Sequence, residues 1–417
     1  MKTGDNLSYI FYCSIKSIYC ISLLFLLKYH RILCLIIMQF LTITVFSQHN
    51  LVRVYYSNSK SIKEEYYAII KNNDTIKNGD YKYFDKTGNL IQEGKYVNNK
   101  LDSIWNIYYP AGEIKSKYQY LGDKKNGLYE AYYQSGAIKT TGQYANNMKD
   151  GLFRTYYETG ELMEEAYYRN DMLNGISTGY LKDKSLKFRI NFQNNINYGL
   201  WEKYHDNGNI NYRGKKIGNI YIDTLYTYNK QGYLQRVSIY KQGKLNGEFK
   251  TYYENGQLQF TCNYIDGMIE GEYFEYFSDG SLMQEGKYAG NNKVGIWKAY
   301  YLTGELFSKG KFIDDKYMGQ WYVYYGNGNI KQVGDFDNGI ETGRWKYFYE
   351  NGNLKRTGIY INGLKQGIWK DYYKDGQIYS IAHYINNIPD GVVWFFDKGN
   401  KINNKTIYIS GKDINIL

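Results

Sequence analysis

From residue 79 onward, apolar and polar positions follow one another with a fixed period of 24 residues. Within each period, large apolar residues alternate with polar ones over runs of six to eight residues, and small turn-forming residues separate the runs. This alternation is typical of β-strands with one buried face. No stretch after residue 48 sustains a 3.6-residue apolar period, so the pattern predicts almost no helix there.

Each period begins with an anchor position, which is glycine in all but two cases. The first anchor is Gly79 and the last is Gly391, and the 312 residues between them are thirteen periods without an insertion or deletion. Ser103 and Asp223 replace the glycine in the other two repeats. An internal period of 20 to 50 residues indicates a repeat array.

Aromatic residues recur at two further positions of the repeat. Five residues after each anchor stands Phe84, Tyr108, Tyr132, Tyr156, Tyr180, Tyr204, Tyr228, Tyr252, Tyr276, Tyr300, Tyr324, Phe348, Tyr372 or Phe396. Seven residues before most of the next anchors stands another aromatic residue, such as Tyr288 or Phe312. Two residues after the anchor there is usually a further large apolar residue, such as Trp297. We expect these side chains to form the core and not a ligand platform.

Turn residues divide each repeat into two strands. A glycine nine residues after the anchor commonly follows Asn, Asp, Thr or Ser, as in Asn207-Gly208 and Asp279-Gly280. A second turn, such as Gln242-Gly243, leads to the next repeat. Both dipeptide types favour β-hairpins. The repeat beginning at Gly175 departs from the pattern, because Ser177 replaces the apolar residue and Lys184 the turn glycine.

These observations predict an all-β fold, an elongated and twisted array of antiparallel β-hairpins from about fourteen repeats with about 28 strands. Lone hairpins are marginally stable, so neighbouring hairpins must stabilise one another. We expect a signal peptide or membrane-anchor region at 1–47, an N-terminal capping segment with a degenerate repeat at 48–78, the repeat array at 79–402 and a C-terminal capping strand at 403–417.

The N-terminal region holds two apolar blocks, residues 9–27 and 32–47, separated by Lys28-Tyr29-His30-Arg31. The second block behind a basic stretch is typical of a signal peptide, with Ser47 before the expected cleavage point. The two blocks could also form an uncleaved hairpin anchor, and a start inside the sequence would leave a signal of ordinary length. We expect an exported protein (periplasm, outer envelope or extracellular), with membrane anchoring through residues 9–47 as the alternative to cleavage.

Composition offers little catalytic chemistry. The net charge is +11, but lysines are interspersed with acidic residues, so we expect no nucleic-acid partner. Cys13, Cys20 and Cys34 precede residue 48, so a chain without its leader retains Cys262 alone and forms no internal disulfide or thiolate metal cluster. Adjacent Glu164 and Glu165 should point to opposite faces of a strand. His205 stands at an aromatic position, and we expect it to be packed.

The motif Gly-x-Trp-x-x-Tyr-Tyr-x-x-Gly followed by Gly-x-Tyr-x-x-Gly resembles the variant MORN repeat (membrane occupation and recognition nexus). It is also similar to the YwqK antitoxin family, which is built from the same repeat. The resemblance covers residues 79 to 400. It implies an array of β-hairpins used for protein or membrane contact, and the antitoxin family implies a toxin as partner.

We therefore expect a non-catalytic, envelope-associated scaffold for protein–protein interaction, with an unidentified protein partner, and with membrane or cell-wall contact as a further expectation. An antitoxin-like protein and a cell-wall or glycan-binding module are the alternatives. We expect no enzyme activity, no catalytic, cofactor-binding or metal-binding residues, and no cofactor.

Overall fold

The computed structural model describes residues 49–414, which contain 35 β-strands and no helix. The expected leader at 1–47 lies outside the described residues, as do residues 415–417 of the expected C-terminal cap. No helix among the described residues is long and apolar enough to span a membrane. The chain forms two compact units, with the boundary between Lys124 and Lys125, and each is described by itself below.

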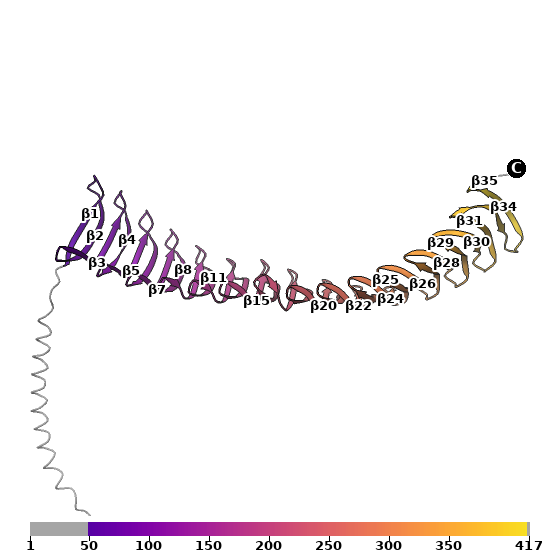
Figure 1. The fold of residues 1–417 in the computed structure, drawn as a ribbon, viewed down its shortest axis with the longest axis horizontal. Coiled ribbons are helices and arrows are strands. Elements are labelled where there is room, and N and C mark those ends of the chain that lie inside the picture. The colour runs from indigo at the N-terminus through magenta and orange to yellow at the C-terminus, as the bar shows by residue number, and fades with distance from the viewer. Residues whose placement is uncertain (1–48, 415–417) are drawn as a thin grey trace, which may run out of the picture. The chain divides into compact units, whose positions relative to one another are not determined.

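In the N-terminal unit, each strand pairs antiparallel with the next one in the chain (Figure 1). A hairpin of β1 and β2 precedes the first anchor glycine, and Tyr56 after β1 donates its hydroxyl to the carbonyl oxygen of Phe84 at 2.8 Å. The strands are β1 (His49–Tyr55), β2 (Ile62–Lys71), β3 (Asp74–Phe84), β4 (Leu90–Val97), β5 (Lys100–Tyr108) and β6 (Ile114–Leu121).

The C-terminal unit continues the same antiparallel pattern, and its hairpins follow one another in chain order (Figure 1). Its strands are β7 (Lys124–Tyr132), β8 (Ile138–Ala145), β9 (Met148–Lys149), β10 (Gly151–Tyr156), β11 (Leu162–Arg169), β12 (Met172–Leu173), β13 (Gly175–Tyr180), β14 (Leu186–Gln193), β15 (Ile196–Tyr204), β16 (Ile210–Ile217), β17 (Ile220–Tyr221), β18 (Thr224–Tyr228), β19 (Leu234–Lys241), β20 (Lys244–Tyr252), β21 (Leu258–Ile265), β22 (Met268–Tyr276), β23 (Leu282–Ala289), β24 (Asn292–Tyr300), β25 (Leu306–Ile313), β26 (Lys316–Tyr324), β27 (Ile330–Asp337), β28 (Ile340–Phe348), β29 (Leu354–Ile361), β30 (Leu364–Tyr372), β31 (Ile378–Ile385), β32 (Ile388–Pro389), β33 (Gly391–Phe396), β34 (Ile402–Ile409) and β35 (Lys412–Ile414).

The all-β prediction is confirmed, and the larger number of strands has simple causes. The hairpin β1–β2 and the short strand β35 lie outside the fourteen repeats. Four strands are also interrupted near their anchor, which leaves the two-residue pieces β9, β12, β17 and β32. After β3, uninterrupted strands of the repeats have eight or nine residues, slightly longer than expected, because the second turn uses only two residues.

The two turns of the repeat differ in geometry. In the second turn both residues have positive φ, as at Asp314 (47°) and Asp315 (62°), which is typical of a type I′ turn. In the first turn, the backbone amide of Gly304 donates to the carbonyl oxygen of Tyr301. The backbone amide of Tyr301 donates in turn to the carbonyl oxygen of Glu305. This is a three-residue loop that needs a left-handed residue, and Gly304 supplies it with φ of 95°.

Candidate interaction surface

One face of each sheet, which we call the ladder face, carries aromatic rings that pack edge to face across successive strands. In the C-terminal unit, Trp297 packs against Phe312 at 6.0 Å with an interplanar angle of 81°, and Phe312 packs against Trp321 at 5.2 Å and 84°. In the N-terminal unit, Tyr96 packs against Trp105 at 5.2 Å and 89°. Edge-to-face pairs contribute about 0.5–1.5 kcal/mol each beyond their buried area, so the ladder couples each hairpin to the next.

Each ladder tryptophan except one lies against a glycine of the preceding repeat. A Cβ atom added to Gly310 would lie 2.0 Å from the Trp321 ring, and one added to Gly334 would lie 2.1 Å from Trp345. The same close approach joins Gly94 to Trp105, Gly286 to Trp297 and Gly358 to Trp369. These glycines lie within strands, so the indole that covers each one, and not a turn, requires the glycine.

Hydrogen bonds join neighbouring hairpins at both rows of turns. At the first turn, the Tyr301 hydroxyl donates to the carbonyl of Tyr324 at 2.8 Å, and Tyr349 donates likewise to Tyr372. At the second turn, Asp315 Oδ1 accepts from the Lys293 amide at 2.7 Å, while the Asp315 amide donates to the Lys293 carbonyl at 3.2 Å. These links fix the register between repeats.

His205 replaces the bridging tyrosine of the first turn. Its Nε2 lies 3.1 Å from the carbonyl oxygen of Tyr228, the same contact that Tyr301 makes with Tyr324. The prediction that His205 is a packed residue at an aromatic position is confirmed. The second tyrosine of the Tyr-Tyr pair is visible in the sequence. The period of the sequence alone does not reveal that the hydroxyl of this tyrosine bridges two hairpins.

Lysines two residues before the anchor cover the edge of the ladder. Lys293 Nζ lies 4.1 Å from the Trp297 ring centroid, and Lys365 Nζ lies 4.9 Å from that of Trp369. Burial lowers the pKa of both ammonium groups. Such cation–π contacts stabilise the fold modestly, so part of the lysine excess has a structural role.

Within residues 49–414, the acidic pair and the cysteine that could take part in catalysis or metal binding are either far from one another or buried. Glu164 accepts from Ser177 at 2.8 Å on the ladder face, whereas Glu165 lies 3.5 Å from Arg154 on the opposite face, which confirms that the pair points to two sides. Burial raises the pKa of the Cys262 thiol to about 11. In this range, no group of three or more His, Cys, Asp or Glu residues could hold a metal ion.

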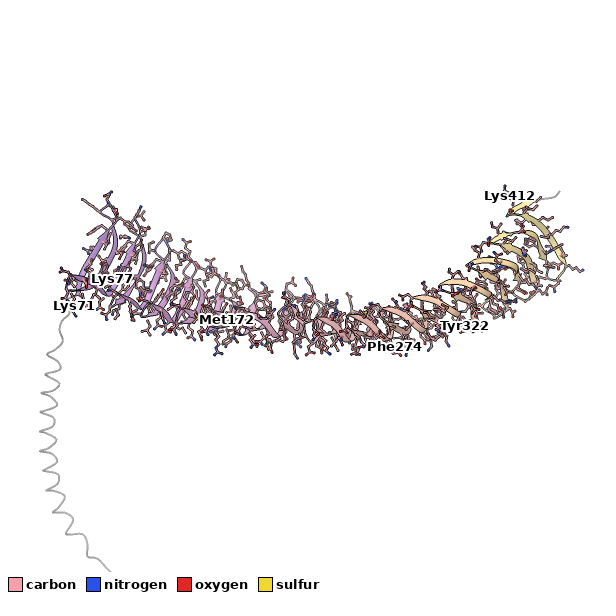
Figure 2. All side chains as sticks on the ribbon, viewed as in Figure 1. Lys71, Lys77, Met172, Phe274, Tyr322 and Lys412 are labelled. Carbon is pink, nitrogen blue, oxygen red and sulfur yellow. The ribbon has the colours of Figure 1, made fainter. Side chains whose placement is uncertain are left out.

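The face opposite the ladder, which we call the outer face, carries the side chains one, three, fourteen and sixteen residues after each anchor; Phe274 and Tyr322, labelled in Figure 2, are two of them. From Gly127 to Gly290 these positions hold six basic and six acidic residues: Arg154, Arg189, Arg213, Lys215, Lys250 and Lys287, with Glu130, Glu165, Glu202, Glu248, Glu272 and Glu285. Many of these charges pair locally, as Arg213 does with the buried Glu202 at 2.9 Å.

From Gly295 onward, the outer face becomes basic and apolar. Its charged residues are Lys298, Lys309, Lys311, Arg344, Lys346, Lys370 and Lys405 against Asp335 alone. Among the described residues, Lys298 forms an ion pair, with Glu285 at 2.8 Å, and the other six basic residues form none. Exposed aliphatic residues lie among these charges at Ile296, Ile359 and Ile368. Others lie beside them at the second turns, eighteen and twenty-one residues after an anchor: Ile340, Ile361, Leu364, Ile385, Ile388 and Ile409. All nine are 37–58% exposed, and the same turn positions also hold Lys316 and Asp337. We call the outer face of residues 295–409, together with these second-turn residues, the docking face.

The family model of the MORN repeat variant matches nine segments of the chain: residues 77–98, 125–146, 149–170, 245–266, 269–289, 293–314, 319–338, 341–362 and 365–386. No curated protein sequence matches. Two of the solved structures that resemble the chain are a TcdB2-TccC3-Cdc42 complex (12% identity, 78% of this chain and 19% of that chain, TM-score 0.15) and the Photorhabdus luminescens Tc holotoxin pore (13%, 88% and 24%, TM-score 0.15).

The chain spans about a quarter or less of the length of these solved structures. A TM-score of 0.15 is too low to show a shared fold or function. The family matches, by contrast, coincide with the hairpins described above, and each covers most of one 24-residue repeat. The chain belongs to the family of MORN repeat variant proteins.

Proposed function

We propose that the protein is a non-catalytic scaffold whose docking face binds a partner protein with an acidic and apolar surface. The observation that carries the proposal is the set of six unpaired basic side chains among nine exposed aliphatic ones. Extended exposed apolar patches on soluble proteins mark sites of association. Unpaired charges of one sign favour a partner of the opposite sign and speed its approach.

The mixture of residues favours a protein partner over the other candidates. Interfaces with nucleic acid are more polar than those between proteins, and a row of isoleucines contributes little to phosphate contact. A glycan-binding module would expose its aromatic rings, but Trp105, Trp297, Trp321, Trp345 and Trp369 are all buried in the ladder. The family match concerns the repeat alone, so it supports a scaffold and brings no toxin partner with it.

We propose further that the protein acts outside the cytoplasm, exported or anchored by residues 9–47. Support comes from the apolar blocks and the basic break between them. Mass spectrometry of the protein recovered from cell fractions tests this, since an envelope or secreted location with a new N-terminus near Gln48 is expected. Recovery of the intact chain in the cytoplasm would contradict export.

The docking face is tested by reversing three of its charges, Lys309→Glu, Arg344→Glu and Lys346→Glu, in the full chain. A matched control reverses the same number of exposed lysines at first turns, Lys374→Glu, Lys398→Glu and Lys401→Glu. Both variants change the net charge equally, and neither set contacts the ladder.

Crosslinking in envelope extracts should capture a protein that the wild type and the control retain and that the docking-face variant loses. The purified partner should then bind directly, with an affinity that falls as salt rises. Equal loss in the control, or equal capture by all three chains, would contradict the proposal. Binding to anionic vesicles or nucleic acid without any protein partner would also overturn it.

A further inference from the structure

The ladder face holds one row of polar side chains where the aromatic ladder is weakest. The row crosses adjacent strands β15, β16, β18, β19 and β20 through the cross-strand neighbours Lys203, Tyr212, Thr227, Arg236 and Thr251. At this place Leu225 stands where most other repeats have a ladder aromatic residue.

Three atoms of this row are buried and lack a hydrogen-bond partner within the described residues: Thr227 Oγ1, Arg236 Nε and Thr251 Oγ1. Buried polar atoms are nearly always paired, because an unpaired one costs about 1–3 kcal/mol. Three such atoms on three consecutive strands indicate that a partner from outside the chain completes the site. Arg236 forms no ion pair among residues 49–414, so that partner should carry negative charge.

The protein contains a completed version of the same arrangement five repeats later. Arg356 occupies the repeat position of Arg236, thirteen residues after its anchor, and Asp371 occupies that of Thr251. The cross-strand pairing is the same, Arg236 with Thr251 and Arg356 with Asp371. Arg356 Nε donates to Asp371 Oδ1 at 2.5 Å, and the Ser380 hydroxyl donates to Asp371 Oδ2 at 3.1 Å.

The Arg236 row offers no carboxylate of its own. The next acidic side chain in this row is Glu275 on β22, three strands from Arg236 or about 14 Å at ordinary strand spacing. Glu275 already accepts from the Tyr273 hydroxyl at 3.1 Å and from the Gln284 amide. The guanidinium of Arg236 is thus left with hydroxyl neighbours in place of an acid.

We propose that Arg236, Thr227 and Thr251 bind an oxyanion, a carboxylate or a phosphate group, in the place that the Asp371 carboxylate has beside Arg356. A guanidinium and two hydroxyl donors suit such a ligand, because charge-assisted hydrogen bonds to an oxyanion are the strong ones. The site is on the ladder face, whereas the docking face lies opposite. The inference therefore does not depend on the proposed partner protein.

The test is a titration of the full chain with acetate and with inorganic phosphate by isothermal calorimetry, at constant ionic strength in chloride. Saturable binding of one anion per chain is expected. Preference for acetate identifies a carboxylate ligand and preference for phosphate a phosphoryl ligand, and each outcome supports the site. Absence of saturable binding of either anion would overturn the proposal.

Two substitutions locate the binding. Thr251→Asp supplies the missing carboxylate from within, so it should weaken anion binding at least about tenfold while unfolding at an equal or higher temperature. Asp371→Thr should create a second site at Arg356 and raise the stoichiometry to two. If Thr251→Asp binds anions as the wild type does, the assignment to Arg236 is wrong.

Discussion

Two regions of the C-terminal unit share one hairpin backbone and differ in the side chains that pack on its ladder face. The four regular repeats, residues 295–390, place Trp297, Trp321, Trp345 and Trp369 in the ladder. The three central repeats, residues 175–246, place Ser177, Trp201 and Leu225 at the same position, and the family model leaves residues 171–244 unmatched. Both regions nevertheless keep the same turns and cross-strand register.

The difference shows that backbone pairing and the links between turns preserve the repeat, while the ladder determines how tightly it is packed. In the central repeats, Ser177 and Ser238 are fully buried, and the strand around each of the anchors Gly175 and Asp223 is interrupted. Arg236 of the central repeats lies on the ladder face, and its Nε has no partner. In the regular repeats, which bury rings on glycine, the arginine at the same position, Arg356, is paired with Asp371.

Removal of a ladder indole should have the largest effect. Trp345→Ala should destabilise its hairpins by about 3–5 kcal/mol, because a buried tryptophan loses its packing on Gly334 and Phe336. Ser177→Ala, at the same repeat position, should cost only about 1 kcal/mol through its hydrogen bond to Glu164. Native-state hydrogen exchange of β27–β29 and β13–β14 measures both. Equal losses would show that the ladder does not distinguish the regions.

The glycine under the indole can be tested by a double-mutant cycle. Gly334→Ala should cost about 1–3 kcal/mol, because the new methyl group would overlap the Trp345 ring. In the Trp345→Ser background the same alanine should cost almost nothing, as Ala166 before Ser177 illustrates in the central repeats. Urea unfolding followed by hydrogen exchange gives the coupling energy. Additive costs would contradict the pairing.

Lys184 gives the central region a strained turn. Its φ of 70° is left-handed, where the corresponding residue of other repeats is a glycine such as Gly304. Lys184→Gly should therefore stabilise the hairpin β13–β14 by about 1 kcal/mol, and Gly304→Lys should destabilise β24–β25 by a similar amount. Thermal unfolding and local exchange measure the two changes. A loss of stability in Lys184→Gly would show that the lysine side chain has a role of its own.

The smallest effect at neutral pH is expected from the ladder tyrosines. Burial raises the pKa of Tyr288 and Tyr384, so the folded state favours the neutral phenol. Their contribution is fully present below the unfolded pKa of about 10 and is lost as pH rises through the folded pKa. Tyr288→Phe should reduce the loss of stability between pH 8 and alkaline pH in urea unfolding, as Phe312 already does one repeat later. An unchanged alkaline slope would argue against this cause.

The period of the sequence predicts the hairpins, their number and the burial of the aromatic residues, because all of these depend on positions that repeat. The pairing of Trp345 with Gly334 was also present in the sequence, since a glycine stands eleven residues before five of the seven tryptophans. The second tyrosine of each pair, such as Tyr301, gave no sign of its bond to the next hairpin, because an i to i+23 contact depends on how hairpins stack.

The docking face and the Arg236 row could not be predicted from the sequence. Lys309, Arg344 and Lys346 stand among acidic residues along the chain and are separated from them by the alternation of strand faces. Arg236 and Arg356 differ in both cross-strand neighbours, Thr227 and Thr251 against Tyr347 and Asp371, and the register of the strands brings these neighbours to the arginine. Surfaces and buried polar groups thus depend on register, whereas the core depends on the period.

Five ladder indoles rest on a glycine that belongs to the previous repeat, so such a repeat is completed only by the one that follows it. Duplication or deletion of any 24 consecutive residues keeps the eleven-residue spacing between these two positions at the new junction, whereas the insertion or deletion of one residue would misplace the ring and reverse the faces of the strand. Gene duplication can therefore lengthen or shorten this protein in whole hairpins at little structural cost. The 312 residues between Gly79 and Gly391, free of insertions, are the outcome that this constraint favours.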